Sequence, residues 1–110
     1  MAARKSKAVR TLERAIGGPL TFGGMLTAIR LGEELSLSAF AAQLGVSRHH
    51  LCDVERGRRL VSPERAAAWA DKLGYNVEQF VQLALQASLD AANVPLSVTV
   101  SASHPPSRRV

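Results

Sequence analysis

The chain has 110 residues, of which 46% are hydrophobic and 21% are charged, so the composition favours one folded domain with short extensions over a disordered chain. Its formal net charge is +5, and a basic balance favours a polyanionic partner, with nucleic acid first. One cysteine excludes an internal disulfide, and no signal-peptide core or apolar run near the ~18 residues of a membrane span is present. We therefore expect a cytoplasmic protein with no membrane partner.

The positive charge is clustered along the chain. Residues 1–14 hold five basic residues and one acid, and residues 47–65 hold five arginines and three acids. The sequence Gly-Gly-Pro at residues 17–19 interrupts any helix that begins in the basic region. We therefore expect three parts: a basic N-terminal arm at 1–18, a helical domain at 19–92, and a C-terminal strand with a flexible tail at 93–110.

Five helices are predicted in the domain from apolar periodicity and from helix-capping residues. The expected N-caps are Thr21, Ser36, Ser47, Ser62 and Asn76, and the glycines expected to end helices are Gly45, Gly57 and Gly74. Gly23 and Gly24 are expected to weaken the first predicted helix. The positions expected to face inward in the first four helices are Phe22, Met25, Leu26, Ile29; Phe40, Ala41, Leu44; Leu51, Val54; and Ala66, Trp69, Ala70, Leu73. The last helix is apolar at Val77, Phe80, Val81, Ala84, Leu85 and Leu89, which is more apolar surface than a terminal helix needs for one small core.

A different pattern follows the last helix. Apolar residues at 94, 96, 98 and 100 alternate with Pro95, Ser97, Thr99 and Ser101, which predicts a short strand rather than a helix. The expected fold is therefore all-α, with five helices, a basic N-terminal arm and a short C-terminal β-strand.

The stretch SRHHLCDVERG at residues 47–57 admits more than one chemistry. His49 and Cys52 have a workable spacing for a metal on one helix, but two ligands are too few for a structural zinc site. A redox-active thiol at Cys52, close to several arginines in the sequence, is a second alternative, although an unreactive small side chain is the simpler interpretation. A solvated polar surface is the plain alternative for Arg48 and His49. We predict no metal and no cofactor.

The spacing of several short motifs narrows this choice. Gly45-Val46-Ser47 separates two short helices, as the turn of a helix-turn-helix does. Over about residues 22–82 the pattern resembles the XRE/Cro family of helix-turn-helix domains. The residues that carry the resemblance are Arg30, Leu35-Ser36, Phe40-Ala41, Leu44-Gly45-Val46-Ser47, Leu51, Val54-Glu55-Arg56-Gly57 and Leu73-Gly74.

This resemblance implies that the helix after Ser47 lies in the DNA major groove. The implied base contacts are Arg48, His49 and Asp53, with His50 and Cys52 beside them, and the implied phosphate contacts are Ser38, Ser47, Arg56, Arg58 and Arg59. It also implies an ion pair between Arg30 and Glu55 that ties the scaffold together. Leu37 stands where the family often has a glutamine that contacts phosphate, and an exposed Leu37 could instead touch a partner or a thymine methyl.

Four further stretches are similar to the HigA-type antitoxins of bacterial toxin–antitoxin pairs: residues 18–23 (GPLTFG), 50–53 (HLCD), 62–67 (SPERAA) and 82–86 (QLALQ). The similarity implies a cytoplasmic bacterial homodimer that represses its own operon at an inverted repeat and neutralises a RelE-like ribonuclease toxin. The residues expected at the dimer or toxin interface are Val81, Leu85, Leu89, Leu96, Val98 and Val100. The alternative is a stand-alone XRE-type regulator or prophage-type repressor. No catalytic constellation or small-molecule motif is recognisable, so we do not expect an enzyme.

Overall fold

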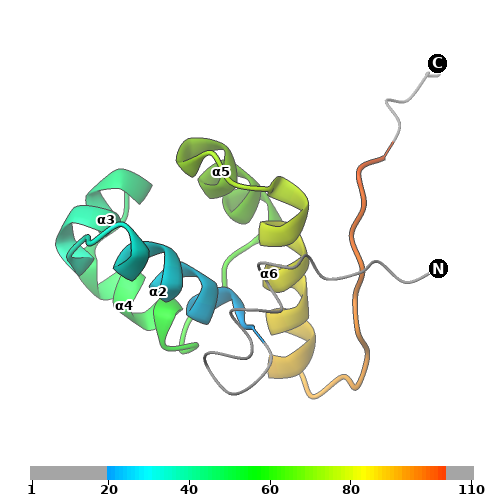
Figure 1. Ribbon diagram of the computed structural model, residues 1–110. Coiled ribbons are helices and arrows are strands. Elements are labelled where there is room, and N and C mark those ends of the chain that lie inside the picture. Colours follow the sequence, from blue (N-terminus) through cyan, green and yellow to red (C-terminus); the bar gives the residue numbers. More distant parts are fainter. Residues whose placement is uncertain (1–19, 104–110) are drawn as a thin grey trace.

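The structure is a computed structural model that describes residues 20–103, so the predicted basic arm and the end of the predicted tail lie outside the described residues. Five helices are described: α2 (Phe22–Gly32), α3 (Leu37–Leu44), α4 (Arg48–Glu55), α5 (Pro63–Leu73) and α6 (Val77–Ala91). In Figure 1, α2, α3 and α4 form one half of the molecule, and α5 and α6 form the other. The helical part of the predicted fold is confirmed.

Local capping determines where the helices begin and where several end. The side chains of the five expected N-caps each accept a hydrogen bond from the backbone N–H three residues later, at 2.7–3.1 Å. Gly45 and Gly74 are C-caps with positive φ angles of 76° and 77°. Gly57 also has a φ of 76°, two residues beyond the last residue of α4. Glycine adopts this left-handed conformation without the steric penalty of a Cβ atom.

The helices enclose one apolar core in which aromatic rings join α2, α5 and α6. Phe22 stacks on Trp69 with ring centroids 6.3 Å apart and meets Phe80 edge-on at 5.9 Å. The expected inward residues of α3 and α4 are all buried, whereas Ile29, Leu73, Val77 and Val81 are only partly buried at the edge of the core. Leu20, Val61 and Leu83 are core residues that the helical periodicity did not identify.

Gly23 has a packing role that explains its place in the first turn of α2. A Cβ atom there would lie 2.4 Å from the carbonyl oxygen of Val54 and 2.5 Å from that of Glu55. No side chain fits in this space, so the backbone of α2 approaches the end of α4 as closely as only glycine allows. The expected loss of helix propensity at Gly23 therefore accompanies a close contact between two helices.

The predicted C-terminal β-strand was wrong. Residues 94–103 form no β-strand, and they run as an extended segment beside α6 (Figure 1). A β-strand requires the backbone of a neighbouring strand, and the described residues 20–103 contain none. Side chains of α6 bind the segment instead: the amide of Gln86 bonds to Leu96 and Val98, and that of Gln82 bonds to Val100. None of the described helices is both long and apolar enough to cross a membrane.

Candidate nucleic-acid interface

The turn between α3 and α4 has a fixed geometry. The left-handed Gly45 ends α3, and the N–H of Val46 donates to the carbonyl oxygen of Ala41 at 3.0 Å. Ser47 then begins α4, and its Oγ accepts from the N–H of His50 at 3.0 Å. Leu44 and Leu51 are buried on either side of the turn. The two short helices are thus held at a defined angle, as in a helix-turn-helix.

An ion pair fastens the end of α4 to α2, as predicted. Nε and Nη2 of Arg30 donate to the two carboxylate oxygens of Glu55 at 2.9 and 3.1 Å. The hydroxyl of Thr27 donates to the same carboxylate at 3.0 Å, and Nη1 of Arg30 donates to the carbonyl of Leu35 at 3.2 Å. The side chains of Arg30 and Glu55 are only 16% and 7% exposed. A largely buried bidentate pair of this kind fixes the relative orientation of the two helices.

The face of α4 opposite its buried residues carries the predicted base contacts. Leu51 and Val54 are fully buried, whereas Arg48 and His49 are exposed and Cys52 and Asp53 are half-exposed. The helical period explains this division, because positions 48, 49, 52 and 53 lie away from 51 and 54. Asp53 also pairs with Nε of Arg58 at 3.5 Å, where both side chains are largely exposed. This face offers donors and acceptors to a ligand outside the domain.

His50 lies differently from the other residues of this set. Its ring packs against the buried ring of Trp69 in α5, with centroids 6.5 Å apart, and its Nε2 lies 3.3 Å from Nη1 of Arg65. Because arginine only donates, Nε2 acts as the acceptor and the neutral ring is favoured. Burial lowers the pKa of His50, and the charges of Arg59 and Arg65 lower it further, against the opposing charge of Asp53. His50 therefore joins α4 to α5.

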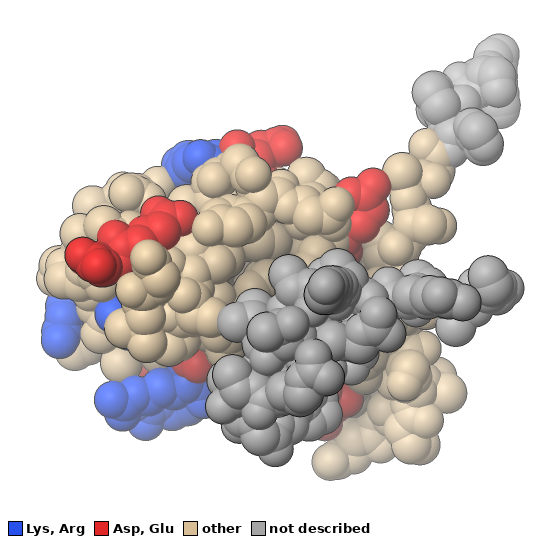
Figure 2. Space-filling view, in the orientation of Figure 1, with Lys and Arg blue, Asp and Glu red and all other residues tan. Residues whose placement is uncertain are grey.

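Basic side chains surround α4. Arg56, Arg58 and Arg59 follow the helix and are exposed, and Arg65 is exposed in the first turn of α5. Figure 2 shows Lys and Arg side chains gathered at the lower left, on the side of the molecule where Figure 1 places α4. Ser38 is exposed in the first turn of α3, while the hydroxyl oxygen of Ser47 already accepts the capping bond. Sequence reasoning included Arg65 in the basic cluster without giving it a role.

Leu37, which stands at the position of the family's glutamine, is not the exposed residue that the sequence suggested. Its side chain is half-buried and packs against the core. An apolar side chain in the first turn of α3 is stabilised when it leaves water and packs against other apolar side chains, so its burial follows from the hydrophobic effect. Leu37 therefore contributes to the stability of α3, and the exposed groups of this turn belong to Ser38 and Ala39.

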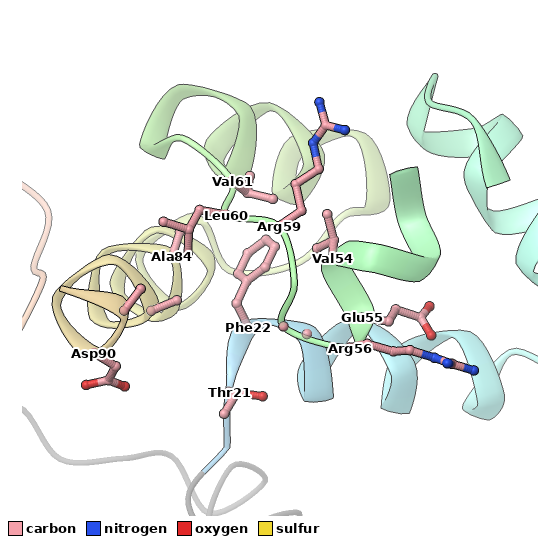
Figure 3. Close-up of a pocket in the computed structure, with 14 residues that line it drawn as sticks. Thr21, Phe22, Val54, Glu55, Arg56, Arg59, Leu60, Val61, Ala84 and Asp90 are labelled. Carbon is pink, nitrogen blue, oxygen red and sulfur yellow. The ribbon is translucent and has the colours of Figure 1, made fainter. Parts of the chain in front are cut away.

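Two other kinds of site are poorly supported. Within residues 20–103, no three His, Cys, Asp or Glu side chains lie together where they could hold a metal ion. A hollow of about 420 Å³ lies between the start of α2, the loop after α4 and the end of α6. In Figure 3 its interior is apolar, with Phe22 and Val61, whereas the guanidinium groups of Arg56 and Arg59 point away from it. Polar groups that would orient a small ligand do not converge in this hollow.

Comparison with known protein families matches residues 21–83 to a helix-turn-helix domain. The match covers more than half of the chain, and the chain belongs to this family. Comparisons with curated proteins and with solved structures gave no match. The helix-turn-helix is a module for sequence-specific DNA binding, in which the second helix of the motif enters the major groove. The family and the geometry of α3 and α4 together support DNA as the partner and transcription regulation as the type of function.

Proposed function

We propose that this protein is a transcriptional repressor that binds a specific operator by placing α4 in the major groove. The observation that carries the proposal is the division of α4 into two faces. Leu51 and Val54 are locked into the core, while Arg48 and His49 extend from the opposite side. A rigid helix with free polar side chains on its outer face can read the edges of base pairs.

The side chains of the outer face have suitable chemistry for direct readout. Arg48 can donate two hydrogen bonds to O6 and N7 of a guanine, and Asp53 can accept one from the amino group of a cytosine. His49 can donate or accept. Cys52 lies beside them and contacts the same surface of the groove. His50 is assigned a smaller part, because its ring is engaged with Trp69 and Arg65.

Exposed groups around α4 are assigned to the DNA backbone. Arg56, Arg58 and Arg59 lie just after the helix and would contact phosphates by charge. Ser38 would contribute a hydroxyl from α3. Ser47, whose hydroxyl oxygen caps α4, retains its hydroxyl proton to donate to a phosphate. These contacts orient the domain on the duplex, and the outer face of α4 supplies the specificity.

The repressor is proposed to act as a homodimer on an inverted repeat. One α4 covers only a few base pairs, and two copies related by a two-fold axis would place their α4 helices ~34 Å apart, one turn of DNA. Val81, Leu85 and Leu89 of α6 are half-buried in the single chain, whereas Leu96 is 63% exposed. The exposure of Leu96 favours a contribution from the extended segment, where Val98 and Val100 are half-buried like the three residues of α6.

The finer proposal is that the protein is an antitoxin that represses its own operon and neutralises a RelE-like ribonuclease toxin in the bacterial cytoplasm. It is supported by the similarity of residues 18–23, 50–53, 62–67 and 82–86 to HigA-type antitoxins. The second candidate is a stand-alone regulator of the same DNA-binding type. Co-purification with the product of the neighbouring gene separates the two, because only an antitoxin forms a stable complex with a small basic ribonuclease.

DNA binding is tested by selecting duplexes from a random pool with the purified protein. The proposal predicts enrichment of an inverted repeat whose half-sites are centred ~10 base pairs apart. Recovery of duplexes with no shared sequence, at an affinity that depends only on salt, would contradict it, because charge alone binds DNA without sequence preference.

A further inference from the structure

Glutamine side chains of α6 hold the extended C-terminal segment in a manner that the repressor function leaves unexplained. Nε2 of Gln86 donates to the carbonyl oxygen of Leu96 at 2.9 Å, and Oε1 of Gln86 accepts from the N–H of Val98 at 2.9 Å. One side-chain amide thus bonds to the residues before and after Ser97. A residue in a neighbouring parallel strand bonds to the same two groups, so Gln86 takes the place of a β-strand partner.

A second glutamine of α6 makes the same kind of hydrogen bond to the segment. Oε1 of Gln82 accepts from the N–H of Val100 at 3.0 Å, one helical turn before Gln86. Four residues of an α-helix rise about 6 Å and two residues of a strand rise about 6.6 Å. The extended segment runs antiparallel to α6. Two glutamines four residues apart on α6 therefore reach two N–H groups that are two residues apart in the segment and both face the helix.

A third residue fixes the orientation of the Gln86 amide. Nε2 of Gln86 also donates to Oδ1 of Asp90 at 2.9 Å. A carboxylate only accepts hydrogen bonds, so the NH₂ end of the amide must face Asp90 and Leu96, and the oxygen must face Val98. Gln82, Gln86 and Asp90 form one row on α6, which we call the amide clamp.

The opposite edge of the segment is open. Backbone groups of successive residues in an extended chain point to alternate sides, so Ser97, Thr99 and Ser101 face away from α6. Within residues 20–103 their backbone groups make no hydrogen bond. Residues 94–103 contain no charged side chain, and their one proline, Pro95, lies near the beginning of the segment. Edge strands of monomeric proteins are commonly blocked by charged side chains or proline, and this edge lacks such protection where it faces outward.

We propose that the amide clamp presents residues 97–101 as a preformed edge to the same segment of a second copy of the chain. The clamp residues are positioning residues, since they bind the side of the segment that the partner does not use. This inference rests on the proposed homodimer and adds to it the residues that prepare the interface. The absence of charge supports a second copy as the occupant, because two identical neutral segments meet without repulsion.

The two-fold axis of the homodimer determines how the two edges meet. An isologous contact of two short segments is antiparallel, with each residue paired to its counterpart on the other side of the axis. If the axis passes through Thr99, Thr99 pairs with itself and Ser97 pairs with Ser101. The Cα atoms of such a hydrogen-bonded pair lie ~5.5 Å apart, within the range that a disulfide can bridge.

The first experiment locates the axis by cross-linking in a Cys52→Ser background, which removes the native thiol. Thr99→Cys is expected to give a disulfide-linked dimer under mild oxidation. Ser101→Cys, on the same outward edge and also exposed, is the control. Its two copies would lie about 13 Å apart along the segment, at ~3.3 Å per residue, so no bridge should form.

The second experiment compares Gln86→Leu with Gln79→Leu, which changes a glutamine of α6 whose side chain makes no hydrogen bond within the described residues. Gln86→Leu should speed hydrogen exchange at the Val98 amide and weaken dimerisation by about tenfold. Gln86→Glu places a carboxylate oxygen against the carboxylate of Asp90 and the carbonyl oxygen of Leu96, so it should also speed exchange at the Val98 amide. Far-UV circular dichroism checks that each variant is folded, and sedimentation gives the dimer dissociation constant.

The outcomes separate this inference from the proposed homodimer. A wild-type protein that sediments as a monomer at all concentrations overturns both. A dimer whose dissociation constant is the same for Gln86→Leu and Gln79→Leu, or that cross-links equally through positions 99 and 101, overturns the amide clamp and leaves the homodimer standing. Weaker dimerisation of Gln86→Leu alone, with cross-linking only at position 99, supports the clamp.

Discussion

Gly23 of α2 lies against the carbonyl oxygen of Val54 in α4, at a distance where an added Cβ atom would be only 2.4 Å from that oxygen. The contact joins α2 directly to the backbone of the helix proposed to read DNA. Together with the Arg30–Glu55 pair, it fixes the end of α4 from two sides. The position of the outer face of α4 therefore depends on contacts inside the domain as well as on the sequence of α4 itself.

Gly23→Ala is expected to destabilise the fold by about 2–3 kcal/mol, because the new methyl group forces two packed backbones apart. Operator affinity should fall as well, since α4 must shift. Gly32→Ala is the control in the same helix: a Cβ there meets no atom within 4 Å, and it should stabilise by roughly 0.5–1 kcal/mol. Urea unfolding measures both. Equal stabilities for the two variants would show that α2 and α4 are not in close contact.

Glu55→Ala should lower the free energy of unfolding by roughly 3–5 kcal/mol, because it leaves the largely buried guanidinium of Arg30 without its carboxylate partner. Asp53→Ala removes a carboxylate from the same helix, where the pair with Arg58 is exposed, and should change stability by about 0–1 kcal/mol. Thermal unfolding of the two variants side by side measures the difference. A Glu55→Ala protein as stable as Asp53→Ala would show that the buried pair contributes nothing.

Stability should decrease as the pH falls below about 6.5, the ordinary pKa of histidine. Burial of His50 against Trp69 and the charges of Arg59 and Arg65 lower its pKa in the folded protein, so the unfolded chain binds the proton at a higher pH. Unfolding is then favoured as protons are taken up, and stability is regained as the pH rises to 6.5. Chemical unfolding of wild type and His50→Gln from pH 5 to 7.5 measures this, and an unchanged slope in His50→Gln would contradict it.

Truncation after Asn93 should convert the protein to a monomer without unfolding it. The core residues lie between Leu20 and Ala84, so removal of residues 94–110 leaves the helices packed. Operator affinity should drop steeply because two half-sites are no longer bound together. Sedimentation, unfolding and gel-shift measurements on the same protein separate these effects. A truncated protein that remains dimeric would move the interface to Val81, Leu85 and Leu89 of α6.

Local features of the fold were predictable from the sequence. Each N-cap acts on a backbone N–H three residues away, and Gly45 and Gly74 end their helices by a conformation that depends on one residue. These signals need no tertiary structure. The face of α4 was also predictable, because burial of Leu51 and Val54 follows the helical period.

Among features that depend on distant parts of the chain, the family resemblance predicted the ion pair between Arg30 and Glu55, but others were not predictable. The alternation of apolar residues at 94–100 is correct for an extended segment, but a β-strand also needs a partner backbone, and Gln82 and Gln86 supply the hydrogen bonds instead. The closeness of Gly23 to α4 and the contact of His50 with Arg65 arise from the packing of helices. No local pattern marks these contacts.

The proposed function assigns Arg48 to base edges, whereas it assigns Arg58 and Arg59 to phosphates. Arg58→Ala and Arg59→Ala should weaken binding to all sequences and each reduce the slope of log affinity against log salt by about 1. Binding should keep its base preference in both variants, because phosphate contacts carry no sequence information. A relaxed base preference in either variant would move that arginine from the backbone to the groove.

The central claim is tested most directly by measuring the affinity of wild type and Arg48→Ala for the operator and for the set of its single base-pair variants. Arg48→Ala should lose about 1–3 kcal/mol on the operator and discriminate poorly at one or two positions in each half-site, with the other positions still read as in wild type. An Arg48→Ala protein with wild-type affinity and wild-type preference at every position would show that α4 does not read this DNA through Arg48.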